Sequence, residues 1–254
     1  MKLNNLIAKG EFIEVYEDGG KAVKVFSPDM PKNKQKAFNE AMVHATIEAT
    51  GLSIPTIYGV ESVPEKDGAW AIIMDAVKGK TLTQLMAENP DKMDEYLDTM
   101  VNLQLEIHSK TVYHIGKLKD KLTRQINRLD DIGEVRKYEL LTKLAGMPKH
   151  LKLCHNNFTP DNIIIDDEGK VTIIDWVAAK QGNASADVAK TYLMLSLDHP
   201  EAADKYLDKF CEKTKTKKEY VTGWLPIVAA ARLTEKVERE KDLLLKWIDV
   251  ANYE

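Results

Sequence analysis

Residues 153–176 read LCHNNFTPDNIIIDDEGKVTIIDW. Within this stretch two short runs of β-branched residues flank the turn 166–169, whose sequence is DDEG. Apolar runs separated by an Asp- and Gly-containing turn are typical of a β-hairpin. Asn162 comes directly before the first run and Asp175 directly after the second. The stretch therefore predicts a hairpin with an oxygen-bearing side chain at each end.

The spacing of the polar residues fits one known catalytic pattern. Kinases carry a His-x-Asp loop, an Asn five residues after the Asp, and a later metal-binding Asp. His155, Asn162 and Asp175 occupy those places, and Asn157 stands where the pattern has the catalytic Asp. An amide accepts a hydrogen bond from a hydroxyl but does not take its proton, so the loop lacks its general base.

Asn162 and Asp175 are the candidate metal ligands. Mg²⁺ prefers oxygen ligands and is usually held by a few protein oxygens together with water and phosphate oxygens. A lone Asp after a strand is usually a turn residue. The distance of thirteen residues from Asn162 favours the metal-binding interpretation of Asp175.

The first eighty residues predict a small β-rich region with one helix. Alternating runs on both sides of Asp18-Gly19-Gly20 predict a hairpin, and the run KAVKVF at 21–26 predicts a further strand. Apolar residues from Phe38 to Ala49 recur at helical spacing, and strands are expected again within 56–63 and 70–77. The expected order is three strands, a helix and two strands.

Lys24 is the candidate phosphate-binding lysine of this region. It lies on the third predicted strand, where a kinase has the lysine that contacts the α- and β-phosphates. Glu40, on the predicted helix, is its expected ion-pair partner. The alternatives are a half-exposed strand lysine and an exposed helix glutamate. Gly10 lies between the first two strands, where it belongs either to a loop over the phosphates or to a plain hairpin turn.

Residues 72–77, with the sequence IIMDAV, resemble a hinge strand. The backbone around Asp75 and Val77 is expected to hydrogen-bond the edge of an adenine. The same residues also suit an apolar core strand, and both interpretations can hold together. Gly79 then gives the chain freedom to enter a second lobe.

Beyond Gly79 the pattern is mostly helical, with apolar stripes from Met93 to His108 and from Val188 to Leu193. We therefore predict an α+β, bilobal, protein-kinase-like fold. Its expected parts are a nucleotide-binding N-terminal lobe, 1–78, and a larger, mostly helical catalytic and substrate lobe, 79–254.

Composition excludes several classes of protein. The 254 residues are 44% hydrophobic and 30% charged, which is typical of a globular protein rather than a disordered one. A formal net charge of -4 gives no reason to expect nucleic acid as a partner. The absence of a long apolar run argues against a membrane span. Two cysteines, Cys154 and Cys211, form no metal-binding or disulfide pattern, so a cytoplasmic location is expected.

The chain resembles the aminoglycoside phosphotransferases and choline-kinase-like proteins, the small-molecule branch of the kinase fold. Those proteins carry a His-Gly-Asp or His-Asn-Asp loop that often continues to Pro-x-Asn, then Ile-Asp-Trp, Gly and Asp-x-Ala. This sequence has His155-Asn156-Asn157, Pro160-Asp161-Asn162, Ile174-Asp175-Trp176, Gly182 and Asp187-Val188-Ala189.

The resemblance implies a kinase that uses ATP, or another nucleoside triphosphate, with Mg²⁺. It implies transfer of the γ-phosphoryl group to a hydroxyl of a small, mostly cationic molecule. By the same likeness His155 supports the catalytic loop, Asp187 braces it, and 224–232 forms a helix of the substrate lobe.

The resemblance implies amino sugars, choline-like amino alcohols or homoserine-like molecules as acceptors, most of them cationic, and the choice among them stays open. An aminoglycoside site calls for acidic residues, for which the candidates are Asp198, Glu235 and Glu254. A choline site calls for an aromatic box, for which the candidates are Trp176, Tyr192, Trp224 and Trp247.

Three hypotheses remain. The first is a phosphotransferase whose turnover is depressed by Asn157. The second is a silent, nucleotide-binding pseudokinase that acts as a sensor or as a partner-binding module. The third is an unrelated α+β binding protein in which the motifs are accidental.

Overall fold

The computed structural model describes residues 2–130 and 132–249. The chain forms two compact units. The first consists of Met1–Leu85 with Asp161–Val177, and the second of Met86–Pro160 with Ala178–Glu254. The division expected from sequence, 1–78 and 79–254, did not assign the hairpin segment to the N-terminal part. The hairpin joins that part because its first strand pairs with a strand that directly follows Gly79.

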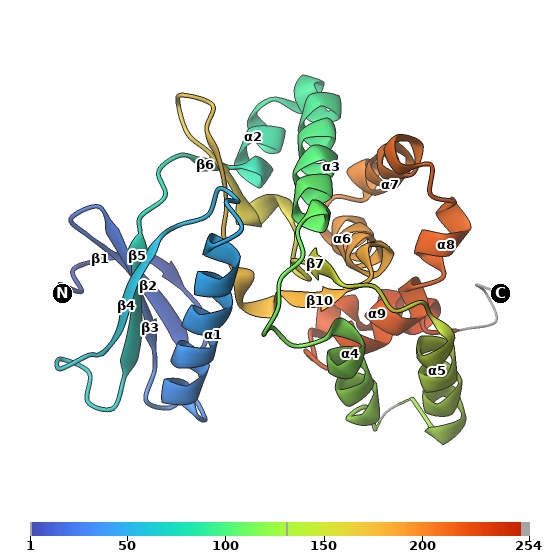
Figure 1. Ribbon diagram of the computed structural model, residues 1–254, viewed down its shortest axis with the longest axis horizontal. Helices are drawn as coiled ribbons and strands as arrows, with labels where there is room; N and C mark the ends of the chain where they lie inside the picture. Colours follow the sequence, from blue (N-terminus) through green and yellow to red (C-terminus); the bar gives the residue numbers. More distant parts are fainter. Residues whose placement is uncertain (1, 131, 250–254) are drawn as a thin grey trace. The chain divides into compact units, whose positions relative to one another are not determined.

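The first unit contains a five-stranded antiparallel sheet of order β1-β2-β3-β5-β4. Its strands are β1 (Asn5–Lys9), β2 (Ile13–Asp18), β3 (Lys21–Phe26), β4 (Ile57–Ser62) and β5 (Trp70–Asp75). Helix α1 (Asn33–Glu48) follows β3 and lies along the sheet (Figure 1). The predicted order of three strands, a helix and two strands is confirmed.

Side chains of β3 alternate between two apolar clusters. Val23 and Val25 pack with Tyr16 on one side of the sheet, whereas Phe26 packs with Ala37 of α1 on the other. Successive side chains of a strand point to opposite faces. Lys24 therefore lies on the same face as Phe26, toward α1.

A second, three-stranded sheet of the first unit has the order β6-β8-β9. Its strands are β6 (Lys80–Thr81), β8 (Ile163–Ile165) and β9 (Val171–Ile173). The predicted hairpin is thus confirmed as β8 and β9. The backbone oxygen of Ser53 accepts from the Ile173 amide at 2.9 Å, which joins β9 to the segment before β4.

The second unit is mostly helical. Its helices are α3 (Met93–Ser109), α4 (Leu118–Asn127), α5 (Glu134–Gly146), α6 (Ala184–Asp198), α7 (Pro200–Thr214), α8 (Lys218–Thr222), α9 (Leu225–Leu233) and α10 (Lys241–Trp247). Helix α6 packs against α7 and α9 (Figure 1). Strands β7 (Lys152–Cys154) and β10 (Lys180–Gly182) pair antiparallel. The predicted helices at 93–108, 188–193 and 224–232 are all present.

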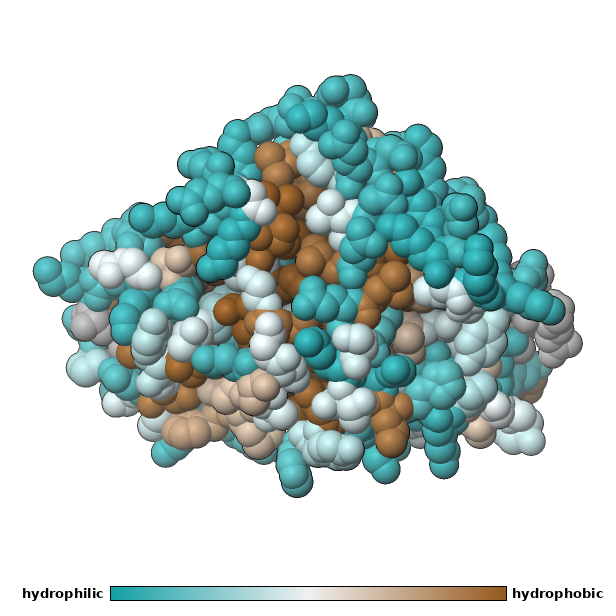
Figure 2. All heavy atoms as spheres, turned by 45° about the horizontal axis from the view of Figure 1, so that its top comes forward, coloured by the Kyte–Doolittle hydropathy of each residue, from teal (hydrophilic) through white to brown (hydrophobic). Residues whose placement is uncertain are grey.

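Short elements complete the chain. They are helix α2 (Leu82–Glu88) and the 3-10 helices η1 (Pro90–Lys92), η2 (Pro160–Asn162), η3 (Trp176–Ala178) and η4 (Glu238–Glu240). Hydrophilic residues cover much of the face drawn in Figure 2, with hydrophobic residues interspersed. None of the helices built from the described residues combines the length and the apolar character needed to cross a bilayer.

Candidate active site

Lys24 is the centre of a charged cluster in the first unit. Its Nζ lies 2.6 Å from Oε1 of Glu40 and 3.7 Å from Oδ1 of Asp175. The side chains of Lys24 and Glu40 are 15% and 7% exposed, whereas that of Asp175 is 31% exposed. The predicted partnership between strand lysine and helix glutamate is therefore present, and the carboxylate after β9 joins it.

The cluster holds two carboxylates around one ammonium group. Burial raises the pKa of Glu40, and the charge of Asp175 raises it further, while Lys24 opposes both effects. A second positive charge close to Asp175 would relieve the repulsion between the carboxylates. The cluster is thus suited to binding a cation beside Lys24.

Asn162 and Asp175 come together at the end of the β8–β9 hairpin. The amide of Ile174 donates to the backbone oxygen of Asn162 at 2.9 Å, which holds the residue before Asp175 against Asn162. Asp175 has a φ of 61°, in the left-handed region that non-glycine residues rarely adopt. Strained backbone of this kind is often found at functional sites. An amide oxygen and a carboxylate form a donor set that fits Mg²⁺.

The other residues predicted to bind the nucleotide, Gly10 and Asp75, make contacts within the first unit. Gly10 lies in the β1–β2 turn, where its amide donates to the backbone oxygen of Ile13 at 2.7 Å. Asp75 uses its carboxylate within the unit, accepting from the Thr56 amide at 3.0 Å and from the Tyr58 hydroxyl at 2.7 Å. The Asp75 amide also donates to the backbone oxygen of Thr56 at 3.0 Å, so both the carboxylate and the amide of Asp75 are engaged within the unit.

Asp75 and Val77 both line a cleft of the first unit with a volume of ≈ 280 Å³. Ser53, Pro55 and Thr172 also line this cleft, but Lys24 does not. This cleft therefore brings together the predicted hinge residues without the predicted phosphate lysine.

The predicted catalytic loop, which contains His155, Asn156 and Asn157, lies in the second unit and is held by Asp187 of α6. The Asp187 carboxylate accepts from the backbone amides of His155 at 3.2 Å and Asn156 at 2.6 Å. Asn156 has a φ of 59°, and its side chain donates to the backbone oxygen of Ala178 at 3.3 Å. These contacts fix the backbone of the two residues that precede Asn157. The bracing role that the resemblance implied for Asp187 is confirmed.

Two further side chains complete the surroundings of Asp187. Its carboxylate also contacts Nε2 of His108 at 3.0 Å and Nε2 of Gln104 at 3.2 Å. Burial by itself would raise the pKa of Asp187. The hydrogen bond and charge of His108, together with His155 and the Asn156 amide, hold it below its usual value. Asp187 is thus a buried, charged anchor for the loop.

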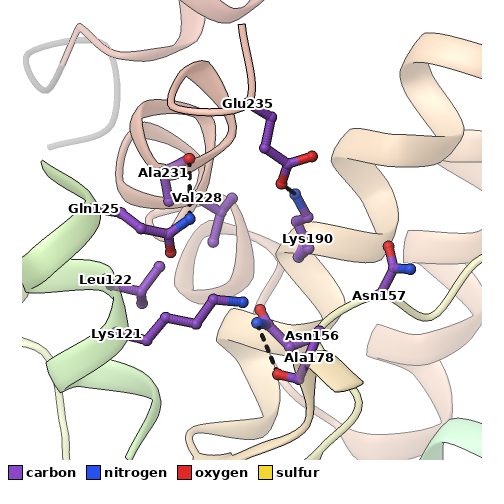
Figure 3. A pocket seen from close by; sticks show the side chains of 10 residues that line it. All are labelled: Lys121, Leu122, Gln125, Asn156, Asn157, Ala178, Lys190, Val228, Ala231 and Glu235. Atoms are coloured by element: carbon purple, nitrogen blue, oxygen red, sulfur yellow. Dashed lines mark hydrogen bonds and ion pairs between the residues drawn. The ribbon is translucent and has the colours of Figure 1, made fainter. Parts of the chain in front are cut away.

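Asn157 lines a cavity of the second unit with a volume of ≈ 170 Å³. The lining residues come from the catalytic loop and from α4, α6 and the α9 region: Lys121, Leu122, Gln125, Asn156, Asn157, Ala178, Lys190, Val228, Ala231 and Glu235. Figure 3 shows Lys121 reaching from α4 toward Asn156, and Lys190 reaching from α6 toward Glu235. Because Asn157 stands at the base position, this cavity is the candidate acceptor site.

The two lysines of the cavity are held in an environment that disfavours their charge. Burial lowers the pKa of Lys190 to about 8, and the nearby cations Arg232 and Lys121 contribute to the shift. Burial also lowers the pKa of Lys121 to about 8, with Lys180 adding to the effect. For each ammonium group, the nearby carboxylates therefore do not offset the cost of burying its positive charge.

The candidate residues for a cationic acceptor are mostly elsewhere. Glu235 lines the cavity, but Asp198 pairs with Arg239 at 2.9 Å. Glu254 lies outside the described residues. The aromatic candidates do not line the cavity: Trp176 and Trp224 are buried, and Tyr192 stacks on Trp247 with ring centroids 5.9 Å apart.

Sequence reasoning missed Lys121, Gln125 and Lys190. Each stands on a helix as an ordinary polar residue, and no motif marks it. The helical pattern of 188–193 places Lys190 between buried positions, which is the one sequence signal that was available.

The fold is shared with solved phosphotransferase structures. A thermostable mutant of the aminoglycoside phosphotransferase APH(4)-Ia, in complex with AMP-PNP and hygromycin B, matches with a TM-score of 0.70 at 15% identity, over 97% of this chain and 91% of that chain. Choline kinase LicA from Streptococcus pneumoniae matches with a TM-score of 0.60 at 14% identity, over 99% and 95%. Amicoumacin kinase hAmiN, in complex with AMP-PNP, Ca²⁺ and Ami, matches with a TM-score of 0.61 at 12% identity, over 96% and 86%. The predicted α+β kinase-like fold, with an N-terminal sheet and a larger helical part, is confirmed.

A local sequence match and a family model complete the comparison. The serine/threonine-protein kinase Haspin homolog ALK1 of Saccharomyces cerevisiae is 46% identical over 57 residues, which is 22% of this chain and 7% of that protein's length. The model of the phosphotransferase enzyme family matches residues 12–220, which include Lys24, Glu40, the catalytic loop and Asp187. With most of its length matched by that model, the chain belongs to the phosphotransferase enzyme family.

Proposed function

We propose that the protein binds ATP with Mg²⁺ and is built to transfer the γ-phosphoryl group to a hydroxyl of a small molecule, with turnover depressed by Asn157. The observation that carries this proposal is the cluster in which Lys24 meets Glu40 at 2.6 Å and Asp175 at 3.7 Å. Kinases use such a lysine to hold phosphates and such an aspartate to hold Mg²⁺. Family membership and the nucleotides in the solved relatives support the same function.

In this proposal each unit has its own task. The first unit holds the nucleotide, with Lys24 on its phosphates and Glu40 positioning Lys24. Asn162 and Asp175 would hold Mg²⁺, which when bound supplies positive charge to the phosphate oxygens. The second unit holds the acceptor in the cavity beside Asn157, and His155 supports the loop.

The reaction exchanges one P–O bond for another. The acceptor hydroxyl oxygen forms a bond to the γ-phosphorus as the bond from that phosphorus to the bridging oxygen of ADP breaks. The hydroxyl proton must leave, and a carboxylate at position 157 would accept it. The amide of Asn157 does not accept a proton, and loss of a general base typically lowers the rate by about 10²–10⁴, or about 3–5 kcal/mol of barrier.

The alternative is a protein that binds nucleotide without turnover. Asn157 is the specific observation that favours it. Asn is nearly isosteric with Asp, so nucleotide binding and folding survive the exchange under either proposal.

The test is Mg²⁺-dependent ATP consumption by the wild-type chain, Asn157→Asp and Asn157→Ala, each with a panel of small hydroxylated molecules. The proposal predicts that Asn157→Asp turns over a panel member about 10²–10⁴ times faster than the other two proteins. Nucleotide binding without turnover in all three proteins would favour the silent alternative. Failure of all three to bind Mg²⁺-ATP would refute both.

A further inference from the structure

The cavity beside Asn157 has an excess of positive charge. Lys121, Lys190 and Glu235 are the charged residues that line it. Glu235 is already engaged, because its carboxylate pairs with Arg232 and lies 4.0 Å from Lys190. Within the described residues, Lys121 forms no ion pair.

Neighbouring charges do not reverse this excess. Arg232 also forms two hydrogen bonds, at 2.6 and 2.7 Å, with the carboxylate of Glu240, so one guanidinium is shared by two carboxylates. With Arg232 and Glu240 included, three cations face two carboxylates, and the excess of positive charge remains. The negative charge of Asp187 acts on Lys121. The Asp187 carboxylate, however, already accepts hydrogen bonds from His108, Gln104 and two loop amides. Lys180 adds another positive charge near Lys121.

Both lysines are buried more than a surface lysine, and Lys190 is only 8% exposed. A buried cation without a full partner is costly, and an anion that enters the cavity would remove that cost. A cationic acceptor would instead place a third positive charge beside the two lysines. The electrostatics of the cavity therefore favour an anion.

The size of the cavity limits the anionic part of the ligand. Its volume is ≈ 170 Å³, and a cavity of about 150 Å³ is known to hold benzene. There is room for a group of about six heavy atoms at this order of magnitude. A carboxylate or a phosphate group with one hydroxylated carbon beside it is of about that size, so the rest of a longer acceptor would extend out of the cavity.

We propose that the acceptor carries a carboxylate or a phosphate group beside its hydroxyl, and that Lys121 and Lys190 bind that group in the cavity next to Asn157. This inference rests on the proposed function and adds the chemical class of the acceptor. It departs from the family resemblance, which implied acceptors that are mostly cationic.

The proposal carries a definite pH dependence. Free Lys121 and Lys190 lose their protons at a pH of about 8, and a bound anion favours the protonated forms. Binding near pH 8 is therefore accompanied by proton uptake, and affinity falls as the pH rises above 8. The charged groups around Lys190 are Glu235, Arg232, Lys121 and Glu240, and those around Lys121 are Lys180, Glu235 and Asp187.

The experiment is calorimetric titration of the full chain with inorganic phosphate, glycerol 3-phosphate, gluconate, glycerol and choline. We expect millimolar or tighter binding of glycerol 3-phosphate, gluconate or both, weaker binding of inorganic phosphate, and no binding of glycerol or choline. The phosphate and carboxylate probes distinguish the two kinds of anion. Titration in buffers of different ionisation enthalpy measures the proton uptake.

Three variants complete the design. Lys121→Met and Lys190→Met are each expected to weaken anion binding about tenfold or more, as the loss of a charged hydrogen bond would. Lys205→Met, at an exposed lysine of α7, is expected to leave it unchanged. Thermal unfolding establishes that each variant is folded. If one of the two cavity variants does not fold, the other still tests the proposal.

Several results would overturn the inference. They are choline binding more tightly than the anions, no saturable binding of any anion, or anion affinity that does not change in the folded lysine variants. Mg²⁺-ATP titrated in the same samples separates the two proposals. If the nucleotide binds and the anions do not, the acceptor class is wrong and the nucleotide site stands.

Discussion

Asp187 connects a single side chain to the shape of the catalytic loop. It is fully buried and accepts hydrogen bonds from His108, Gln104 and the amides of His155 and Asn156. Removing one partner of a buried charge cluster is expensive because the other groups stay buried without compensation. The loop before Asn157 is thus stabilised by one carboxylate.

We predict that Asp187→Asn lowers the free energy of unfolding by about 3 kcal/mol or more. The amide retains an acceptor oxygen but loses the charge that compensates its neighbours. Urea unfolding measures the effect, and Asp208→Asn is the control because Asp208 is exposed and pairs with Lys218 at 2.7 Å. Equal stability of the two variants would show that Asp187 is not the anchor.

The left-handed backbone at Asn156 allows a second test at this scale. Its φ is 59°, a region that glycine enters freely and that costs alanine about 1–2 kcal/mol. We therefore predict that Asn156→Gly is more stable than Asn156→Ala by about 1 kcal/mol. Thermal unfolding of the pair checks the order, and an equal or reversed order would contradict the assigned conformation.

Single elements differ in how far sequence predicts them. The strands from Asn5 to Asp75 and helix α1 follow from alternation, turn residues and helical spacing. Strands β7 and β10 could not be predicted in this way, because each is three residues long and shows no periodicity. Their pairing depends on residues 152–154 meeting 180–182, which only the tertiary structure brings about.

The residues of the candidate site also differ in whether the sequence could predict them. Lys24, Glu40 and Asp175 were predicted because each lies on or directly after a recognisable element and the spacing is characteristic. Lys121 and Lys190 were not predicted because α4 and α6 bring them together only in the folded chain. Local patterns therefore predicted the Lys24 cluster, whereas the candidate acceptor cavity required the packing of helices.

At the level of elements, Gly79 is required for the pairing of β6 with β8. Its φ is 127°, and a Cβ added there would lie 2.3 Å from the backbone oxygen of Ile165. We predict that Gly79→Ala lowers the free energy of unfolding by about 2–4 kcal/mol, from strain and overlap together.

The matched control is Gly146→Ala. Gly146 ends α5, and a Cβ added there meets no atom within 4 Å. The exchange should leave stability unchanged or raise it by less than about 1 kcal/mol. Similar behaviour of the two alanine variants in urea unfolding would contradict the close approach at Gly79.

At the scale of the whole molecule, the lysines of the candidate acceptor cavity make stability depend on pH. The folded chain has a pKa of about 8 for Lys190, against an ordinary value of 10.5. Between these values the unfolded chain binds the proton and the folded chain does not, so the free energy of unfolding rises with pH.

We predict that Lys190→Met stabilises the protein most below pH 8, and that its advantage over the wild type shrinks as the pH rises from 8 toward 10. The change is at most about 1.4 kcal/mol per pH unit for one group. Urea unfolding of both proteins across this range gives the difference. A difference that does not change with pH would mean that the pKa of Lys190 is not lowered by folding.

The proposed role of the Lys24 cluster is to hold the phosphates of a nucleotide with Mg²⁺, and calorimetric titration with ATP in the presence and absence of Mg²⁺ measures this binding. We expect Mg²⁺-dependent binding to the wild-type chain that weakens about tenfold or more in Lys24→Met. Lys21→Met, on the same strand with its ammonium over the Tyr58 ring, should bind as the wild type does. Binding of equal strength by Lys24→Met, or none by the wild type, would show that the cluster does not hold a nucleotide.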